Sequence, residues 1–524
     1  MKSLKQACTL RHSVFDVAKR DTVHTIEDLL NNRIEPTAFF EENYLTQGMR
    51  ELLEKGFRRL EGSSDQGVFK LCQAMGGGKT HNLIALGLLA KYPEFRKQVM
   101  GSFYKPKLLG SAKVIAFNGR ESDCRYGIWG ELAKQLDKFD ELKDYYSPFK
   151  APGQSTWTKL LQGQPLIIML DELPPYLDGA RAVAVANSDL AHVSAEALAN
   201  LFVAVQENLP NVCLVLSDLT HSYEEGRSLL NKAMEKILGE AKRTAYDLHP
   251  VQLNSDEFYH ILRKRLFAQL PDEAEIAEVA QAFADSLRDH KAMALTNATP
   301  EQLASDIKRS YPFHPSLKDL FARFRENSGF QQTRGLIRLL RTIAARLWSD
   351  EQKDPYLLAP YHIDLNDEEQ RKQIVDIHSS LQNAISHDIA HQGNAIAERE
   401  GADAIDTANL LLMSSLATVA NAVRGLSEPE IIHYLAAPGR RLADLHQSVI
   451  EPLRTRCWYL HATNDQKLFF KDEQNFAALL HERSSNYTPE HYKKEIEEKL
   501  REFFSPKLKV CYQQRFPLGF KIFV

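Results

Sequence analysis

Three consecutive glycines followed by lysine and threonine, Gly76-Gly77-Gly78-Lys79-Thr80, constrain this chain more than any other feature. A short apolar strand is predicted before them at 68–71, and a helix is predicted after them at 83–91. Glycines let backbone N–H groups approach a triphosphate closely, and the N-terminus of the helix adds partial positive charge. The pattern therefore predicts a loop that binds the phosphates of ATP.

The residues of this loop take separate roles in that prediction. Lys79 is expected to bridge the β and γ phosphates, Thr80 to ligate Mg²⁺, and His81 to complete the nucleotide-binding set with the glycines. The usual pattern places glycine six residues before the lysine, where this chain has Gln73. The alternative interpretation is a glycine turn that precedes Lys-Thr by coincidence.

An acidic pair, Asp171-Glu172, follows a continuous apolar run at 166–170. Such a run is typical of a strand buried on both faces of a parallel sheet. We expect this strand to lie beside the phosphate-loop strand, so that its carboxylates reach the sheet edge where ligands bind. Asp171 would then hold Mg²⁺, and Glu172 would polarise the attacking water as general base. The alternative is a pair of acids that cap a helix after a buried strand.

Strands and helices alternate around these two motifs. Alternation of this kind predicts an α/β fold of the P-loop NTPase type, with a parallel sheet between helices. The further strands are predicted at 113–117, 212–216 and 245–248, and the helices at 128–136 and 195–206. Residues 254–350 predict helices only, and later helices followed by a hairpin at 458–461 and 467–470 outline a winged helix.

These changes of pattern divide the chain into five expected parts. They are an N-terminal helical segment (1–65), an ATPase core (66–250), a helical lid (251–350), a helical linker with the winged helix (351–485), and a charged helix with a tail (486–524).

Three more side chains are candidates for contact with the nucleotide. Ser217 ends the fourth strand, where it would sense the γ-phosphate or cap the strand end. Arg243 precedes the last strand and would reach the nucleotide of a neighbouring subunit, with a solvated helix-end arginine as the alternative. Arg334 opens a lid helix and would turn back toward the nucleotide, although Arg338 and Arg341 on the same helix make an ordinary basic face the competing interpretation.

In this order the motifs resemble an AAA+ module. More specifically, the chain resembles the large P-loop ATPases of bacterial phage-defence islands, including the BREX-type (phage exclusion) ATPase component and relatives encoded beside DNA methyltransferases. The resembling stretches cover most of residues 8–480 and are Phe39-Phe40-Glu41-Glu42-Asn43-Tyr44, Gln73-Ala74-Met75-Gly76-Gly77-Gly78-Lys79-Thr80-His81, Phe117-Asn118-Gly119-Arg120-Glu121, Leu170-Asp171-Glu172-Leu173-Pro174-Pro175-Tyr176, Tyr311-Pro312-Phe313-His314-Pro315 and Gln331-Gln332-Thr333-Arg334-Gly335-Leu336-Ile337-Arg338.

The resemblance implies ATP and Mg²⁺ as ligands and a role in antiviral defence linked to DNA modification. It implies double-stranded DNA and defence proteins such as a DNA methyltransferase as partners, and the AAA+ likeness makes a homo-oligomer an expectation. In that family Gln-Ala-Met replaces the usual first glycine, which accounts for Gln73. Family members usually continue past this length, so residues 511–524 are expected to be a truncated or frame-shifted tail.

Charge limits how the chain could bind DNA. The net charge of −4 argues against coating nucleic acid through bulk charge, but it leaves a local basic face open. The candidate contacts in the winged helix are Arg440, Arg441, Arg454, Arg456 and Lys467. Acidic residues interleave with them, so a scaffold domain that packs on the lid is the alternative.

Composition favours a cytoplasmic protein. The sequence has no run of about 18 apolar residues that could cross a membrane, and its N-terminus lacks the apolar core of a signal peptide. Six dispersed cysteines fit reduced thiols. Three functions stay open: an ATP-hydrolysing motor or switch that acts on DNA or partner proteins, a nucleotide-gated scaffold with little turnover, and a structural subunit of a modification complex with a vestigial site.

Overall fold

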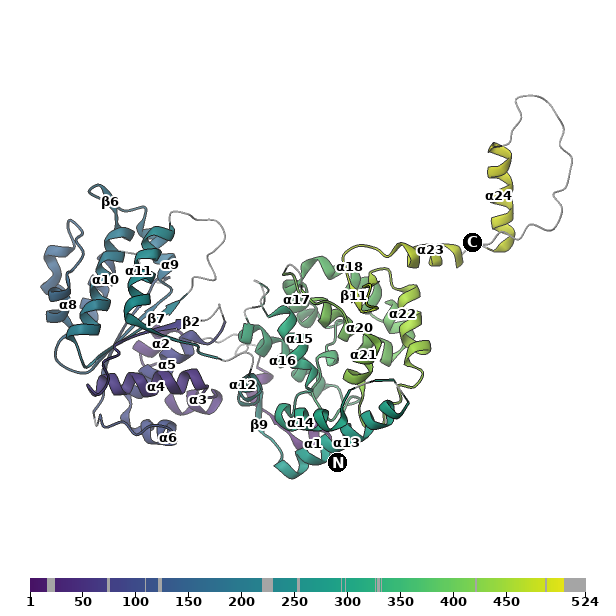
Figure 1. Ribbon diagram of the computed structural model, residues 1–524, viewed down its shortest axis with the longest axis horizontal. Coiled ribbons are helices and arrows are strands. Elements are labelled where there is room, and N and C mark those ends of the chain that lie inside the picture. The colour runs from purple at the N-terminus through teal and green to yellow at the C-terminus, as the bar shows by residue number, and fades with distance from the viewer. Residues whose placement is uncertain are drawn as a thin grey trace.

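The computed structural model describes residues 1–16, 24–72, 76–108, 110–120, 125–218, 230–251, 255–293, 295–296, 298–325, 327, 330, 332–419, 422–485 and 488–503. Within these ranges the chain forms an α/β region built on one parallel sheet, followed by a mostly helical region (Figure 1). None of the described helices combines the length and the apolar character needed to cross a membrane.

Five parallel strands form the central sheet, in the order β3-β4-β7-β2-β8. Every predicted strand is confirmed, with each end within two residues of its expected position. The strands are β2 (Val68–Cys72), β3 (Lys113–Asn118), β4 (Leu166–Asp171), β7 (Val212–Asp218) and β8 (Ala245–Leu248).

Helices cover both faces of this sheet, and the interior strand β4 is accordingly buried at every position. Along β4, Ile167 and Met169 pack into one core, whereas Ile168 and Leu170 pack into the other. The first core is covered by α2 (Ile26–Leu30), α4 (Gln47–Leu60) and α5 (Lys79–Lys91), with α3 (Pro36–Glu42) and α6 (Arg96–Met100) beside them. The second is covered by α7 (Gly127–Gln135), α8 (Gln154–Leu161), α9 (Leu173–Ala180), α10 (Leu190–Asn208) and α11 (Leu230–Thr244).

The position of the acidic strand differs from the prediction. β4 was expected beside the phosphate-loop strand β2, but β7 lies between them and pairs with both. Chain order does not fix strand order, because a crossover helix can carry the chain past a neighbouring strand. The acidic end of β4 still lies at the same edge as the end of β2, since all the strands are parallel.

The second region is a helical assembly with one continuous apolar core. The prediction of helices only at 254–350 is wrong at β9 (Phe267–Gln269), a short strand that pairs antiparallel with β1 (Thr9–Leu10). Its helices are α12 (Glu257–Leu266), α13 (Glu273–Ala292), α14 (Pro300–Ser310), α15 (Ser316–Phe324), α16 (Gln332–Ser349), α17 (Glu368–Ile377), α18 (Gln382–Ala384), α19 (Ile396–Glu400), α20 (Ala402–Ser415), α21 (Glu428–Leu435) and α22 (Glu451–Arg456), with π-helical turns at Ile385–Ile389 and His446–Ile450.

The expected N-terminal segment 1–65 is divided between the two regions. Residues 1–16 contribute α1 (Leu4–Ala7), β1 and apolar side chains such as Val14 to the core of the helical region. Helices α2 and α4 instead cover the sheet of the α/β region. The chain therefore passes between the regions twice, once between residues 14 and 26 and once between residues 248 and 258.

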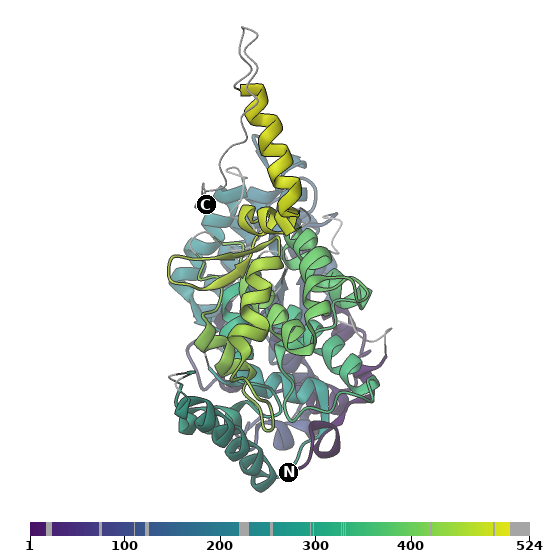
Figure 2. The ribbon, with the colours of Figure 1, turned by 90° about the vertical axis from the view of Figure 1, so that its right-hand side faces the viewer.

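The hairpin expected near 458–470 forms from β10 (Leu460–Ala462) and β11 (Leu468–Phe470). Leu426, in the connection between α20 and α21, forms an antiparallel bridge with Leu468. This connection therefore adds a third extended segment beside the hairpin. After it come α23 (Phe476–Ser485) and α24 (Pro489–Phe503), and Figures 1 and 2 show α24 projecting away from the helical region.

Candidate functional site

The predicted phosphate loop joins the end of β2 to the start of α5. Gly76 and Gly78 have φ angles of +81° and +87°, which glycine adopts without strain. The N-cap residue of α5 is Gly78, which has no side chain to place over the first turn of the helix. Lys79 begins this helix and is buried. Gln73 and its two successors lie outside the described residues.

Asp171 links the loop to the neighbouring strands. Its carboxylate accepts a hydrogen bond from Thr80 Oγ1 through Oδ2 at 3.2 Å, and another from the Ser217 hydroxyl through Oδ1. Only 5% of Asp171 and 2% of Ser217 are exposed. The first turn of α5 and the ends of β4 and β7 thus converge on one buried carboxylate, and Thr80 and Ser217 both contact Asp171.

Glu172 follows in a left-handed backbone conformation, with φ of +53°. Its side chain forms an ion pair with Arg120, whose Nε lies 3.0 Å from Glu172 Oε2. The backbone of Glu172 lies close to that of Gly119, and only glycine fits there, because a Cβ on residue 119 would lie 2.0 Å from the backbone oxygen of Glu172. The glycine after β3 therefore lets the ends of β3 and β4 pack backbone against backbone.

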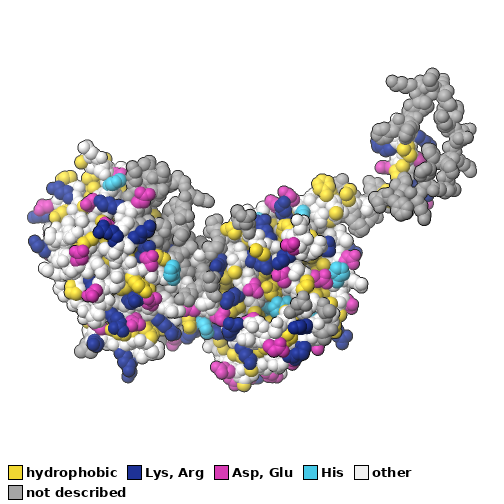
Figure 3. Space-filling model, viewed as in Figure 1, with side chains coloured by type: hydrophobic (Ala, Val, Ile, Leu, Met, Phe, Trp, Pro, Cys, Tyr) yellow, Lys and Arg dark blue, Asp and Glu magenta, His cyan; other side chains and the backbone are white. Residues whose placement is uncertain are grey.

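A cavity of about 670 Å³ opens in front of these residues, between the two regions of the protein. The phosphate loop, Asp171 and Glu172 line one side, and α12 and α16 line the other. Figure 3 shows the regions as separate lobes with basic side chains near the seam. Six lysine and arginine residues line the cavity but only three carboxylates do, so its walls favour a polyanion.

The helical region contributes Arg334, as predicted, together with Arg338 and Arg341. It also contributes Arg265 from α12, which the sequence analysis missed. Arg265 lies in the run Arg263-Lys264-Arg265 at a helix end, which is a common pattern for solvated charge. Its contact with His81 of the α/β region distinguishes it from Arg263, whose guanidinium donates to backbone carbonyls of the helical region.

Arg265 Nη2 donates to His81 Nε2 over 2.8 Å. Burial and the adjacent Arg265 charge lower the pKa of His81 to about 3, so this imidazole is neutral at physiological pH. Burial lowers the pKa of Arg265 to about 10, which leaves its guanidinium cationic. The predicted nucleotide-binding residue His81 therefore has a fixed hydrogen-bonding partner in the helical region.

Arg243 lies apart from this cavity. It lies in the last turn of α11, before the first residue of β8, whereas the cavity lies at the carboxyl ends of the strands. Its side chain is 77% exposed and pairs with Glu240 on the same helix at 3.2 Å. The expected contact with a neighbouring subunit stays a prediction.

The oxygen chemistry at the loop suits a magnesium ion. Thr80 Oγ1 and Asp171 Oδ2 are hard oxygen donors 3.2 Å apart, and Mg²⁺ commonly takes one or two protein oxygens beside substrate phosphates. Two buried polar atoms in the cavity wall, Asn82 Oδ1 and Thr333 Oγ1, have no hydrogen-bond partner among the described residues. Such atoms are expected where a wall contacts a polar ligand.

The predicted DNA contacts near the hairpin are mostly engaged with acids. Arg440 is largely buried between Asp403 (2.6 Å) and Asp406 (2.9 Å). Arg456 pairs with Glu400, and Lys467 pairs with Glu430 at 3.3 Å. These pairs join secondary-structure elements of the helical region to one another, which favours the scaffold alternative for this part of the chain.

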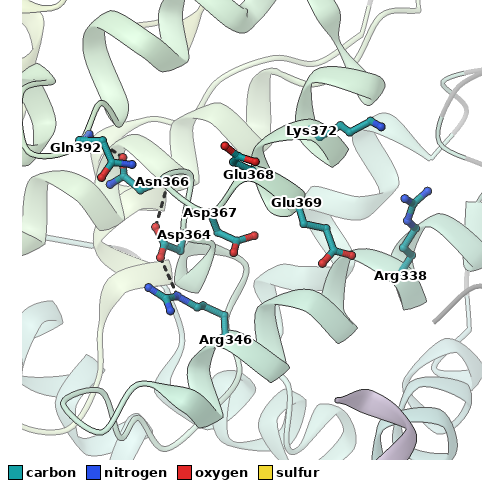
Figure 4. Close-up of a pocket in the computed structure, with 9 residues that line it drawn as sticks. All are labelled: Arg338, Arg346, Asp364, Asn366, Asp367, Glu368, Glu369, Lys372 and Gln392. Carbon is teal, nitrogen blue, oxygen red and sulfur yellow. Dashed lines mark hydrogen bonds and ion pairs between the residues drawn. The ribbon is translucent and has the colours of Figure 1, made fainter. Parts of the chain in front are cut away.

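A second cavity, of about 770 Å³, lies between α16 and α17 (Figure 4). Two of its carboxylates have local partners: Asp364 pairs with Arg346 at 3.0 Å, and Asp367 caps α17 by accepting from the Gln370 N–H. Among the described residues no group of three His, Cys, Asp or Glu side chains is arranged to hold a metal ion. This cavity therefore shows no chemistry comparable to the first.

Two family models match the chain. Residues 13–116 and 107–243 match the DUF499 N-terminal domain, and residues 254–421 match the DUF499 second domain. No match is found among curated proteins. The gap between the two matches, residues 244–253, contains β8 and ends shortly before α12. On this evidence, with its parallel α/β core followed by a helical region, the chain belongs to the DUF499 family.

Proposed function

We propose that this protein binds Mg-ATP in the cavity between its two regions and hydrolyses it. The observation that carries the proposal is the contact of Asp171 with Thr80 in the first turn of α5, a helix whose N-cap residue is Gly78. It brings a buried carboxylate, a hydroxyl and a row of N–H donors to one point. This is the combination that a metal-bound triphosphate needs.

Each residue then has a defined task. Lys79 and the N–H groups of the loop hold the phosphates, while Thr80 and Asp171 hold the magnesium ion, which would neutralise charge on the phosphate oxygens. Ser217 keeps the Asp171 carboxylate in place through its hydrogen bond. Glu172 accepts a proton from the attacking water once its side chain turns from Arg120 toward the cavity.

The strand order supports an AAA+-like version of this site. Strand β7 lies between β2, which precedes the phosphate loop, and β4, which precedes Glu172. Glu172 is therefore farther from the loop than it would be if β4 were adjacent to β2. That spacing leaves room for a water molecule between a general base and the γ-phosphate. The helical region then acts as the lid, and Arg334 provides positive charge from it.

Two substitutions test the proposal. Lys79→Ala removes a charge-assisted hydrogen bond and should weaken Mg-ATP binding by roughly 10- to 100-fold. Glu172→Gln should leave binding within about threefold and slow phosphate release by about 10²- to 10⁴-fold. Lys113→Ala at the start of β3 is a matched lysine control at the far edge of the sheet. Normal turnover by Glu172→Gln would exclude the general-base role.

The nucleotide-gated scaffold is the second candidate. It is favoured by the position of the cavity between two regions, because a ligand there can set their arrangement without turnover. The biological setting that we propose is bacterial antiviral defence, with DNA or a modification enzyme as partner. Measuring phosphate release with and without double-stranded DNA separates a DNA-dependent motor, in which DNA raises the rate, from a scaffold, in which it does not.

A further inference from the structure

The contacts that join the two regions around the cavity include several isolated polar ones. Glu257 accepts a hydrogen bond from the Gln47 N–H at 2.6 Å, and Arg11 Nη2 donates to the Glu41 carbonyl at 3.0 Å. His260 stacks on Tyr44 with ring centroids 4.9 Å apart. The main apolar cores on either side are separate. Regions joined by polar contacts of this kind move relative to one another unless something fixes them.

The hydrogen bond between Arg265 and His81 differs from these contacts because of where it ends. His81 directly follows Thr80, so it belongs to the first turn of α5, at the base of the phosphate loop. Its ring stacks on Phe39 with an interplanar angle of 25°. The bond thus joins the helical region to the helix turn that would carry the phosphates.

The direction of this bond follows from the chemistry of the two groups. A guanidinium only donates, so His81 Nε2 accepts and the proton of the imidazole is on Nδ1. Arg265 is held from the other side by Glu42, whose Oε2 lies 3.9 Å from Nη1. The guanidinium therefore spans the seam, with its stem in the helical region and its nitrogen atoms against the α/β region.

The stem of Arg265 is rigidly connected to the rest of its region. Phe258, Leu262 and Leu266 of the same helix α12 are fully buried in the helical core. A helix anchored in this way moves with its region as one body. Any shift of the first turn of α5 that moves His81 is consequently transmitted to the whole helical region, or it breaks the bond.

We propose that the hydrogen bond between His81 and Arg265 is the link through which nucleotide at the phosphate loop sets the position of the helical region. This inference rests on the Mg-ATP binding proposed above. Arg265 is then a positioning residue: it holds the region in the arrangement in which the α16 arginines face the phosphates. Without the bond, a smaller fraction of molecules adopts that arrangement. The apparent affinity for nucleotide then falls in proportion to this fraction.

A double-mutant cycle tests this link. His81→Phe keeps an aromatic ring on Phe39 and removes the acceptor, and Arg265→Met keeps an apolar stem and removes the donor. Lys264→Met is the matched control, because Lys264 is the exposed neighbour of Arg265 on α12 and does not line the cavity. The readouts are the dissociation constant for Mg-ATP and the hydrogen exchange of residues 257–266 with and without saturating Mg-ATP.

Each single variant should weaken Mg-ATP binding by about tenfold, and the double variant no further. Nucleotide should slow exchange in α12 of the wild type and of Lys264→Met but not of either single variant. Arg265→Lys, which restores a donor, should recover part of both effects. This variant also tests the link if His81→Phe does not fold.

Additive losses in the double variant, or unchanged protection of α12 by nucleotide in the single variants, would overturn the inference. Absence of Mg-ATP binding by the wild-type protein would instead contradict the proposed function. The two failures are therefore distinguishable.

Discussion

Gly119→Ala should inactivate the proposed ATPase without removing any group that takes part in the chemistry. A Cβ at this position would lie 2.0 Å from the Glu172 backbone oxygen and 3.0 Å from Tyr176 Cβ. Contacts between a Cβ and another heavy atom under 3.0 Å are essentially absent from proteins, so the ends of β3 and β4 must separate by about 1 Å. The strain is expected to cost about 1–3 kcal/mol.

The same displacement should affect turnover more than stability. Glu172 would move with its backbone, and a misplacement of about 1 Å in a catalytic group can cost about 10²-fold in rate. We expect phosphate release to fall by about that factor, while Mg-ATP affinity changes by less than about threefold, because Lys79 and Thr80 are on a different strand–helix connection.

The assay is steady-state phosphate release at saturating Mg-ATP, together with direct nucleotide titration and thermal unfolding. Gly153→Ala is the control, since nothing lies within 4 Å of a Cβ there. Wild-type turnover by a folded Gly119→Ala protein would refute the reasoning, because it would mean that the position of Glu172 does not control the rate.

Three further substitutions test the interpretation of individual arginines. Arg59 is 3% exposed and donates to the backbone carbonyls of Leu209 and Val212, before and at the start of β7. Arg59→Met should therefore destabilise the α/β region by about 3–5 kcal/mol, measured as a fall in its unfolding temperature. The exposed Arg58→Met is the control and should not lower that temperature. Arg440→Ala should lower the unfolding temperature of the helical region, because it breaks the ion pairs of the largely buried Arg440 with Asp403 and Asp406. DNA binding should be unchanged, and Arg441→Ala is the control. A selective loss of DNA affinity would contradict the scaffold role. Arg243→Ala should leave the turnover of dilute monomer unchanged and should reduce turnover by about 10³-fold or more in an assembled state. A turnover rate per molecule that does not depend on protein concentration, in the wild type and in Arg243→Ala, would exclude the contact with a neighbouring subunit.

The sequence alone predicted the strands of the sheet well, because β3, β4 and β7 each contain a continuous apolar segment next to turn residues. β4 illustrates this, since alternate side chains enter two different cores and no polar face interrupts the pattern. Its place in the sheet was not predictable in the same way. Nothing local in residues 166–171 encodes that β7 inserts between it and β2.

The candidate site divides along similar lines. The proximity of Thr80 and Asp171 was predictable, because a loop after one strand and an acid at the end of another meet at the same edge of a parallel sheet. Arg265 was not, because its role depends on a contact with His81, which lies 184 positions away in the chain. Likewise β9 is too short to give a strand pattern, and its pairing with β1 is visible only in three dimensions.

The pairing of β1 with β9 has a consequence for the order in which the protein is made. Leu10 pairs with Phe267, so the first strand leaves the ribosome long before its partner exists. At synthesis rates of about 5–20 residues per second the delay is on the order of tens of seconds. During that time the α/β region, whose strands all precede β9, can complete its sheet, while Leu4, Leu10 and Val14 remain without the core that will bury them. The helical region can close only after the beginning of the chain returns to it, so a fragment that starts after β8 would fold with part of its core missing.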